Sequence, residues 1–295
     1  MAQARRRLLA VRERRVHPGR DDKVLAAWNG LTARVLAEAG RALGRADYVG
    51  AAARNAGFVL SAMRRDGRLL RTWKAGQAKV KGYLEDYAMV AAALLEVYEA
   101  TFERRWLEAA RQLVDDMLRL FWDDGLGGFY DTGSDGEPLI VRPRNLFDNA
   151  VPCGSSVAVE TLLRLRVFTG EDRYATTAVA GLRPMGDLMA RHPTAFGRFL
   201  CALDFNLGPV VEVALVWPTG NGHGPLVGEV FGRYLPNRVV VGRAEDDVGA
   251  AAGIPLLEGR QAVDRKATAY VCRNYACQLP ATDSEALARQ LSTSG

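Results

Sequence analysis

The pattern of apolar and polar positions over the first two thirds of the chain is typical of paired helices. Three stretches each read as a helix, a tight break and a second helix, at residues 28–63, 83–118 and 155–189. An aromatic residue follows each break: Tyr48, Trp106 and Tyr174. These aromatics are 58 and then 68 residues apart. The pattern predicts an internal repeat of antiparallel helix hairpins.

The two helices of each pair differ in polarity. The first helix is rich in Ala and Leu on most sides, as in YAMVAAALLEVY, whereas the second carries more charge, as in ERRWLEAARQLVDD. This difference predicts an inner layer enclosed by neighbours and an outer layer that faces solvent. Short turns join inner to outer helices, while the return connections, 67–82 and 122–149, are long. Because successive helices run antiparallel, these long connectors must emerge on one common rim, where binding and catalysis tend to lie.

The second long connector includes the stretch GLGGFYDTGSDG, residues 125–136. Its glycines allow positive φ, and its Asp residues supply charge or turn acceptors. The stretch is either a solvated loop or one wall of a polar site.

The periodicity changes after one further inner helix at 192–207. Three apolar runs read as strands, at 209–217, 237–242 and 266–274. Two segments read as helices, 224–236 and 282–291, the second with a cap at Thr282 or Asp283. The expected fold is therefore mainly α, with a helical domain over 1–207 and a small α/β appendage over 208–295.

Composition and charge limit the classes of protein to which this chain can belong. An apolar content of 48% suits a large globular core, and no long uncharged apolar run predicts a membrane span or a signal peptide. Residues 1–20 hold seven Arg and one Glu, a charge of +6, so the remainder carries −1 of the total of +5. This basic segment lacks aromatics for base stacking, so we expect a solvated helix rather than a nucleic-acid site. The expected location is the cytoplasm.

The four cysteines are too few and too scattered to predict a disulfide framework, so free thiols are expected. Cys272 and Cys277 are close in sequence, but their spacing matches neither a thioredoxin motif nor a usual zinc knuckle. Two interpretations of this pair stay open. The cysteines are either two small buried residues on either side of a turn at a strand end, or a thiol pair that a reductant can act on. No metal and no cofactor is expected.

Several longer motifs carry a family resemblance, and they lie at 16–31, 82–88, 127–132, 142–156 and 264–283. Their text is VHPGRDDKVLAAWNGL, GYLEDYA, GGFYDT, RPRNLFDNAVPCGSS and DRKATAYVCRNYACQLPATD. Together they resemble the C-terminal half of the bacterial YyaL-type thioredoxin-domain proteins, which are related to the spermatogenesis-associated thioredoxin-like proteins. The resemblance implies an (α/α)6 toroid of the six-hairpin glycosidase and N-acylglucosamine 2-epimerase type.

The number of hairpins has a consequence for assembly. Three and a half hairpins cannot close a ring of six, and an open half-ring exposes the apolar sides of its terminal inner helices. We therefore expect a homo-oligomer, a separately encoded N-terminal half with a thioredoxin-like domain, or a chain that is a fragment.

The rim is the expected site for a small sugar or sugar derivative. The candidate catalytic carboxylates are Asp86, Asp131 and Asp148, since glycoside chemistry uses paired carboxyls. Each has a structural alternative: a charge at a helix start for Asp86, a turn residue for Asp131 and a helix cap for Asp148. The candidate substrate-binding residues supply rings, carboxyls, amides and guanidiniums: Trp28, Trp73, Glu85, Tyr130, Arg142, Arg144, Asn149 and His192.

Two functions remain open at this point. The first is carbohydrate binding or modification of the hydrolase or epimerase type, incomplete without a second half. The second is a non-catalytic scaffold that associates with a thioredoxin-like domain. The sequence identifies neither the sugar nor the stereochemistry.

Overall fold

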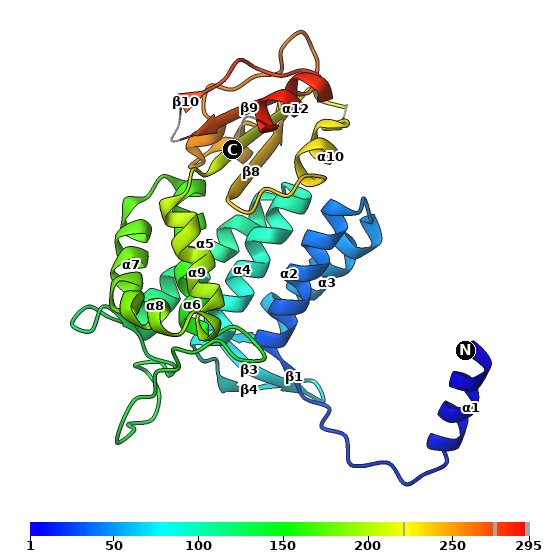
Figure 1. Ribbon diagram of the computed structural model, residues 1–295, viewed down its shortest axis with the longest axis vertical. Helices are drawn as coiled ribbons and strands as arrows, with labels where there is room; N and C mark the ends of the chain where they lie inside the picture. The colour runs from blue at the N-terminus through cyan, green and yellow to red at the C-terminus, as the bar shows by residue number, and fades with distance from the viewer. Residues whose placement is uncertain (221, 274–275, 293–295) are drawn as a thin grey trace.

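Alternating helices form three antiparallel pairs in a computed structural model that describes residues 1–220, 222–273 and 276–292 (Figure 1). The pairs are α2 (Ala26–Ala42) with α3 (Ala46–Ala62), α4 (Leu84–Thr101) with α5 (Arg104–Phe121), and α6 (Gly154–Thr169) with α7 (Asp172–Leu182). The predicted repeat of hairpins is confirmed.

The inner layer consists of α2, α4, α6 and α9 (Gly197–Leu207), with α4 between α2 and α6, and α9 against α6. Helix α4 is buried almost all round because neighbours enclose it, as Tyr87 and Leu94 illustrate. Helix α5 buries only one face, which includes Trp106 and Leu113, and so forms the outer layer. This arrangement is part of an (α/α)6 toroid, and the predicted fold class is confirmed.

The long connectors meet at one end of the helices, at the bottom of Figure 1. The first forms a small sheet of β1 (Val24–Leu25), β2 (Arg64–Arg65), β3 (Arg68–Lys74) and β4 (Gln77–Lys81). The second contains β5 (Trp122–Asp123) and β6 (Gly128–Phe129). The Leu84 N–H donates to the Asp131 carbonyl at 2.9 Å, which joins the start of α4 to the second connector. The predicted common rim is therefore present.

The sheet at this rim was not expected, because the sequence shows residues 67–82 only as a long connector. Strands β3 and β4 pair antiparallel, with Thr72 opposite Lys79. The turn between them has positive φ at Ala75 (49°) and at Gly76 (78°). Two positive φ values in succession are what a tight type I′ hairpin requires.

The last part of the chain forms a four-stranded sheet of order β10-β9-β7-β8 above the opposite ends of the helices (Figure 1). Its strands are β7 (Val211–Trp217), β8 (Arg238–Ala244), β9 (Thr268–Arg273) and β10 (Ala276–Cys277). The parallel pair β7 and β8 is joined through α10 (Leu226–Phe231), as parallel strands require a crossover.

Helix α12 (Ser284–Ser292) completes this part, and its predicted cap is observed, since the Ala286 N–H donates to Asp283 Oδ1 at 2.8 Å. The strands and helices predicted after residue 208 are thus confirmed, except that Asn274 lies outside the described residues. The Phe102 ring, at the turn between α4 and α5, lies 5.6 Å from the Trp217 ring of β7. The domain boundary at residue 207 stays a prediction.

Shorter elements fill the connections: η1 (Arg183–Met185), α8 (Gly186–Arg191), η2 (Pro193–Ala195), α11 (Val248–Ala251) and η3 (Pro255–Leu257). Helix α1 (Ala2–Arg12) buries no residue and stands apart from the rest of the chain in Figure 1. None of the helices in the described ranges has the length and apolar character that crossing a membrane would need.

Candidate functional site

The four inner helices all begin at the rim, so their N-terminal ends converge there. A helix start carries a partial positive charge and unpaired N–H groups. Two of the predicted catalytic carboxylates lie near these helix starts: Asp86 in the first turn of α4, and Asp148 in the connector before α6. Their contacts show how the starts are held together.

Asp86 is fully buried and accepts from the starts of two inner helices. Its Oδ1 accepts the Ala27 N–H of α2 at 3.0 Å, and its Oδ2 accepts the Tyr83 N–H, just before α4, at 2.9 Å. Arg71 Nη1 of β3 also donates to Oδ2 at 3.0 Å. Burial raises the pKa of Asp86, although Arg71 opposes that shift. The structural alternative predicted for Asp86 is thus observed.

Asp148 makes the equivalent bridge between α6 and α9. Its Oδ1 accepts the Cys153 N–H and the Ser156 hydroxyl, both at 2.9 Å. Its Oδ2 accepts the Arg198 N–H in the first turn of α9 at 2.7 Å. The Asp148 carboxylate therefore caps the starts of two helices, α6 and α9. The structural alternative predicted a cap on one helix.

Asp131 lies in the second connector and shapes its path. Its Oδ2 accepts the Asn145 N–H at 2.8 Å, and its own N–H donates to the Pro143 carbonyl at 2.9 Å. Burial raises the pKa of Asp131, and the negative charge of Glu85 adds to the shift. Each of these three carboxyls accepts backbone N–H groups, which gives each a structural role. A catalytic role for them stays a prediction.

Glu85 differs from these carboxyls because its side chain remains partly exposed. Its Oε1 accepts Arg71 Nη1 at 2.6 Å. The Arg71 guanidinium also lies 4.7 Å from the centre of the Tyr83 ring. Trp28 follows Ala27 at the start of α2, and 62% of it is exposed. We call these four residues, Trp28, Arg71, Tyr83 and Glu85, the rim patch.

Tyr130 and its two arginines form the wall beside Asp131. Arg142 lies 4.0 Å from the centre of the Tyr130 ring and donates to the Thr132 carbonyl at 2.5 Å. Arg144 Nε donates to the Phe129 carbonyl at 3.2 Å. Both guanidiniums therefore hold the connector through its backbone carbonyls. The glycine-rich stretch is an ordered wall of the rim.

The other three predicted binding residues, Trp73, Asn149 and His192, are not part of the rim patch. The Trp73 ring packs edge-on against Phe58, with ring centres 5.3 Å apart. Asn149 and His192 are exposed, and the carbonyl of His192 accepts the Ala195 N–H at 3.0 Å. Over the described ranges, no three His, Cys, Asp or Glu side chains come together as a metal site would need.

A concave feature lies between α2 and α9 and has a cavity volume of about 680 Å³. We call it the hollow. Its lining comes from the inner helices and the segment before β8: Leu31, Arg34, Val35, Glu38, Glu96, Glu99, Pro152, Val157, Glu160, Arg164, Arg198, Leu200, Cys201, Asp204, Phe205, Tyr234, Pro236, Asn237 and Arg238. The sequence analysis did not identify it. The available signal was charge within otherwise apolar inner helices, such as Glu96 and Arg164.

The wall of the hollow contains paired buried charges. Glu96 binds the guanidiniums of Arg41 and Arg164, and Glu160 lies 2.8 Å from Arg34 and 2.5 Å from Arg198. Burial opposes ionisation of Glu96, but Arg164 and Arg41 outweigh it and lower its pKa. The pKa of Glu160 is likewise lowered, against its burial, by Arg34 and Arg198. These acids are therefore held ionised.

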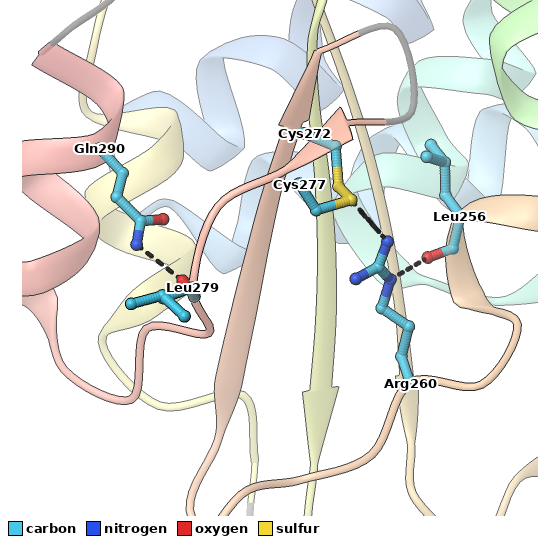
Figure 2. Close-up of a disulfide and its surroundings, with 6 residues drawn as sticks. All are labelled: Leu256, Arg260, Cys272, Cys277, Leu279 and Gln290. Atoms are coloured by element: carbon cyan, nitrogen blue, oxygen red, sulfur yellow. Dashed lines mark hydrogen bonds between the residues drawn. A yellow bond between two sulfur atoms is a disulfide. The ribbon is translucent and has the colours of Figure 1, made fainter.

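The cysteines correct one expectation. Cys272 and Cys277 form a disulfide, whereas the sequence favoured free thiols (Figure 2). The two residues are directly opposite each other in the antiparallel pair β9 and β10, so the register of the sheet brings the sulfurs together. Cys153 and Cys201 are free, as expected.

Comparison with known proteins shows relatives that are longer than this chain. The chain is 34% identical to spermatogenesis-associated protein 20 of Homo sapiens over 291 residues, which is 94% of this chain and 37% of that protein. The Mus musculus protein of the same name is 33% identical over 291 residues, with the same coverage. The match corresponds to the C-terminal part of the human protein. No family model matches the chain.

Two solved structures are similar in fold at low identity. Cellobiose 2-epimerase from Bacillus thermoamylovorans gives a TM-score of 0.47 at 14% identity, over 57% of this chain and 45% of the epimerase. The GH76 α-mannanase from Bacteroides thetaiotaomicron gives a TM-score of 0.48 at 20% identity, over 60% of this chain and 47% of the mannanase.

Proposed function

This chain is homologous to the C-terminal part of spermatogenesis-associated protein 20, and on that premise we propose that it binds a small carbohydrate at its rim. The observation that carries the proposal is the rim patch, where an exposed indole lies at the start of one inner helix and a partly exposed carboxylate at the start of the next. The predicted resemblance to this family is confirmed, while the ligand remains our inference.

The chemistry of the rim patch suits a sugar. An exposed ring such as Trp28 can stack on the apolar face of a pyranose, and the Tyr83 ring is 38% exposed. Glu85 accepts hydrogen bonds from hydroxyl groups, and Arg71 donates to them. Sites for small molecules combine such aromatic surfaces with a few placed polar groups.

Asp86 acts in this proposal as a positioning residue. It accepts the backbone N–H groups of Ala27, next to Trp28, and of Tyr83, two residues before Glu85, so it helps to fix the spacing of the two binding side chains. Glycoside hydrolysis would need two carboxyls around one bond. Glu85 and Asp131 are the pair we favour for that role, because the Leu84 N–H donates to the Asp131 carbonyl at 2.9 Å and so brings the residue next to Glu85 against Asp131. Sugar binding is the primary proposal, and hydrolysis of a bound glycoside is an extension of it.

The test is calorimetric titration of the purified chain with a panel of neutral and acidic mono- and oligosaccharides. We expect a sugar of the panel to bind, with affinity reduced at least tenfold by Trp28→Ala and by Glu85→Gln. Leu139→Ala and Glu137→Gln are the matched controls, because both residues are exposed in the second connector. Affinity unchanged in Trp28→Ala and Glu85→Gln, or no binding by the parent chain, contradicts the proposal.

A second candidate function, assembly, is favoured by the hollow. Val35 on α2 and Tyr234 before β8 both line the hollow and are 61% and 90% exposed, so large apolar side chains meet solvent there. The chain spans about 37% of the length of its human relative. We propose that a complementary half-ring, on a second copy or on a separate thioredoxin-like partner, covers this surface.

Light scattering after gel filtration tests assembly. The expected result is a molar mass above that of one 32.1 kDa chain, either alone or after mixing with a separately expressed upstream half. A Val35→Glu variant should return the mass to that of one chain, whereas Val11→Glu on the isolated α1 should leave it unchanged. A single-chain mass under all these conditions contradicts assembly without affecting the sugar test.

A further inference from the structure

The disulfide between Cys272 and Cys277 has one accessible and one buried sulfur. Cys272 is 1% exposed, whereas Cys277 lies on the exposed edge strand β10. An attacking thiol can therefore approach Cys277 while Cys272 is shielded. This asymmetry fixes which sulfur is attacked and which one leaves.

The bond closes only a short loop and so restricts the unfolded chain less than a long-range disulfide does. A disulfide stabilises mainly by restricting the unfolded chain, and the effect grows with the length of the closed loop. Here the two cysteines are 5 residues apart. Their strands are already paired, with Ala276 opposite Arg273. The backbone pairing therefore holds the two strands in register in addition to the bond.

Arg260 faces both sulfurs and is held there by several contacts (Figure 2). Its Nη2 lies 2.9 Å from Cys277 Sγ and 3.4 Å from Cys272 Sγ. Its Nε donates to the Leu256 carbonyl at 3.0 Å, and its guanidinium lies 4.5 Å from the centre of the Tyr270 ring. The guanidinium is thus fixed before any change in the sulfurs.

A guanidinium is a poor match for the oxidised sulfurs and a good match for the reduced ones. Sulfur in a neutral disulfide is a weak acceptor, whereas a thiolate is a strong, charged one. A nearby Arg stabilises thiolate and lowers the pKa of a thiol. Burial lowers the pKa of Arg260, so a negative sulfur beside it would relieve an unfavourable charge. The surroundings therefore favour the leaving thiolate.

We propose that Cys272–Cys277 is a thiol–disulfide exchange site that a dithiol reductant opens, with Arg260 stabilising the thiolate that leaves. The reductant's thiolate attacks Cys277 Sγ, the Cys272–Cys277 bond breaks, and Cys272 leaves as a thiolate beside Arg260. The second thiol of the reductant then attacks the mixed disulfide and releases Cys277. The chain gains two electrons and two protons, and the dithiol becomes a disulfide.

The test follows reduction of the full chain by dithiothreitol, with acid quenching, alkylation and mass spectrometry of the peptides that carry Cys272 and Cys277. We expect the parent chain to be reduced about tenfold faster than Arg260→Gln, because that variant lacks the cation beside the leaving sulfur. Arg265→Gln, an exposed residue between η3 and β9, is the matched control and should match the parent. Arg260→Lys should recover part of the rate.

The same assay separates the alternatives. Reduction of Arg260→Gln at the parent rate overturns the proposal, and so does a parent chain in which both cysteines remain free thiols after oxidation with glutathione disulfide. A Cys272→Ser/Cys277→Ser double variant with an unchanged unfolding midpoint supports it, because the bond is then not structural. Equal rates with glutathione and dithiothreitol at equal thiolate concentration overturn the preference for a dithiol.

Discussion

Asp86 and Asp148 make matching bridges at the starts of neighbouring inner helices. Asp86 joins the starts of α2 and α4, and Asp148 joins those of α6 and α9. Each carboxylate faces two helix ends that carry partial positive charge. Both residues were predicted as catalytic candidates, and their contacts give each a role in setting the spacing of helices at the rim.

The bridge predicts a loss of stability when Asp148 is removed. Asp148→Ala leaves the Cys153 and Arg198 N–H groups and the Ser156 hydroxyl without this acceptor. We expect the free energy of unfolding to fall by about 2 kcal/mol, as for the loss of a good cap with buried donors. Urea unfolding at pH 7 measures it. Asp187→Ala, an exposed control, should change it by less than about 0.5 kcal/mol, and an equal loss in both variants would refute the bridge.

The rim was predictable from the sequence because helix direction alternates. Once Leu94 and Trp106 are assigned to the inner and outer helices of one pair, the long connectors must lie at one end. The sheet within the first connector was missed because Ala75 at positive φ is unusual for a residue with a side chain. No local pattern signals that conformation.

The hollow could not be predicted from periodicity. Arg34 and Glu160 are 126 residues apart and meet only because α2 and α6 flank α4 in one particular register. The periodicity of apolar residues predicts which face of each helix is buried. It does not predict the axial register of one helix against another. The sequence shows which residues of the inner helices are charged. Which of them form ion pairs depends on how far one helix is shifted along its axis relative to the next.

The pairing predicts that Glu96 is essential to the wall of the hollow. Glu96→Gln removes one of the two carboxylates that bind Arg41 and Arg164, and Glu99 remains as their carboxylate partner. We expect the free energy of unfolding to fall by about 1–3 kcal/mol, as for weakened hydrogen bonds between buried charged groups, because Glu99 still pairs with both arginines. Chemical denaturation should show this loss, and Glu38→Gln, which is exposed on α2, should show almost none. A Glu96→Gln chain as stable as the parent would contradict the network.

The same network predicts how stability depends on pH. Burial opposes ionisation of Glu160, but Arg34 and Arg198 outweigh it, so its pKa is lower in the folded chain than in the unfolded chain. The folded state then binds fewer protons, and stability from this group is present above the unfolded pKa of about 4.3 and is lost as the pH falls below it. Urea midpoints at pH 7, 5, 4 and 3 should fall steeply in the parent.

Glu160→Gln gives the matched comparison for this pH dependence. The variant should be less stable than the parent at pH 7, and the difference should shrink as the pH falls to 3, because only the parent loses the contribution of an ionised Glu160. A constant difference between the two chains from pH 7 to 3 would show that Glu160 does not have a lowered pKa.

The free cysteines provide a probe of what covers the hollow. Cys201 is exposed and lines the hollow, whereas Cys153 is buried and its pKa is raised to about 11, first by burial. At pH 8 only about one Cys153 thiol in a thousand is ionised, and the thiolate is the reactive form. Iodoacetamide should therefore label Cys201 at least 100-fold faster than Cys153, as peptide mass spectrometry would show.

If a half-ring covers the hollow, its addition should slow labelling of Cys201 at least tenfold, with the Cys153 rate unchanged. Rapid labelling of Cys201 in an assembled complex would place the contact elsewhere, because a residue inside the covered hollow cannot keep its access to the reagent.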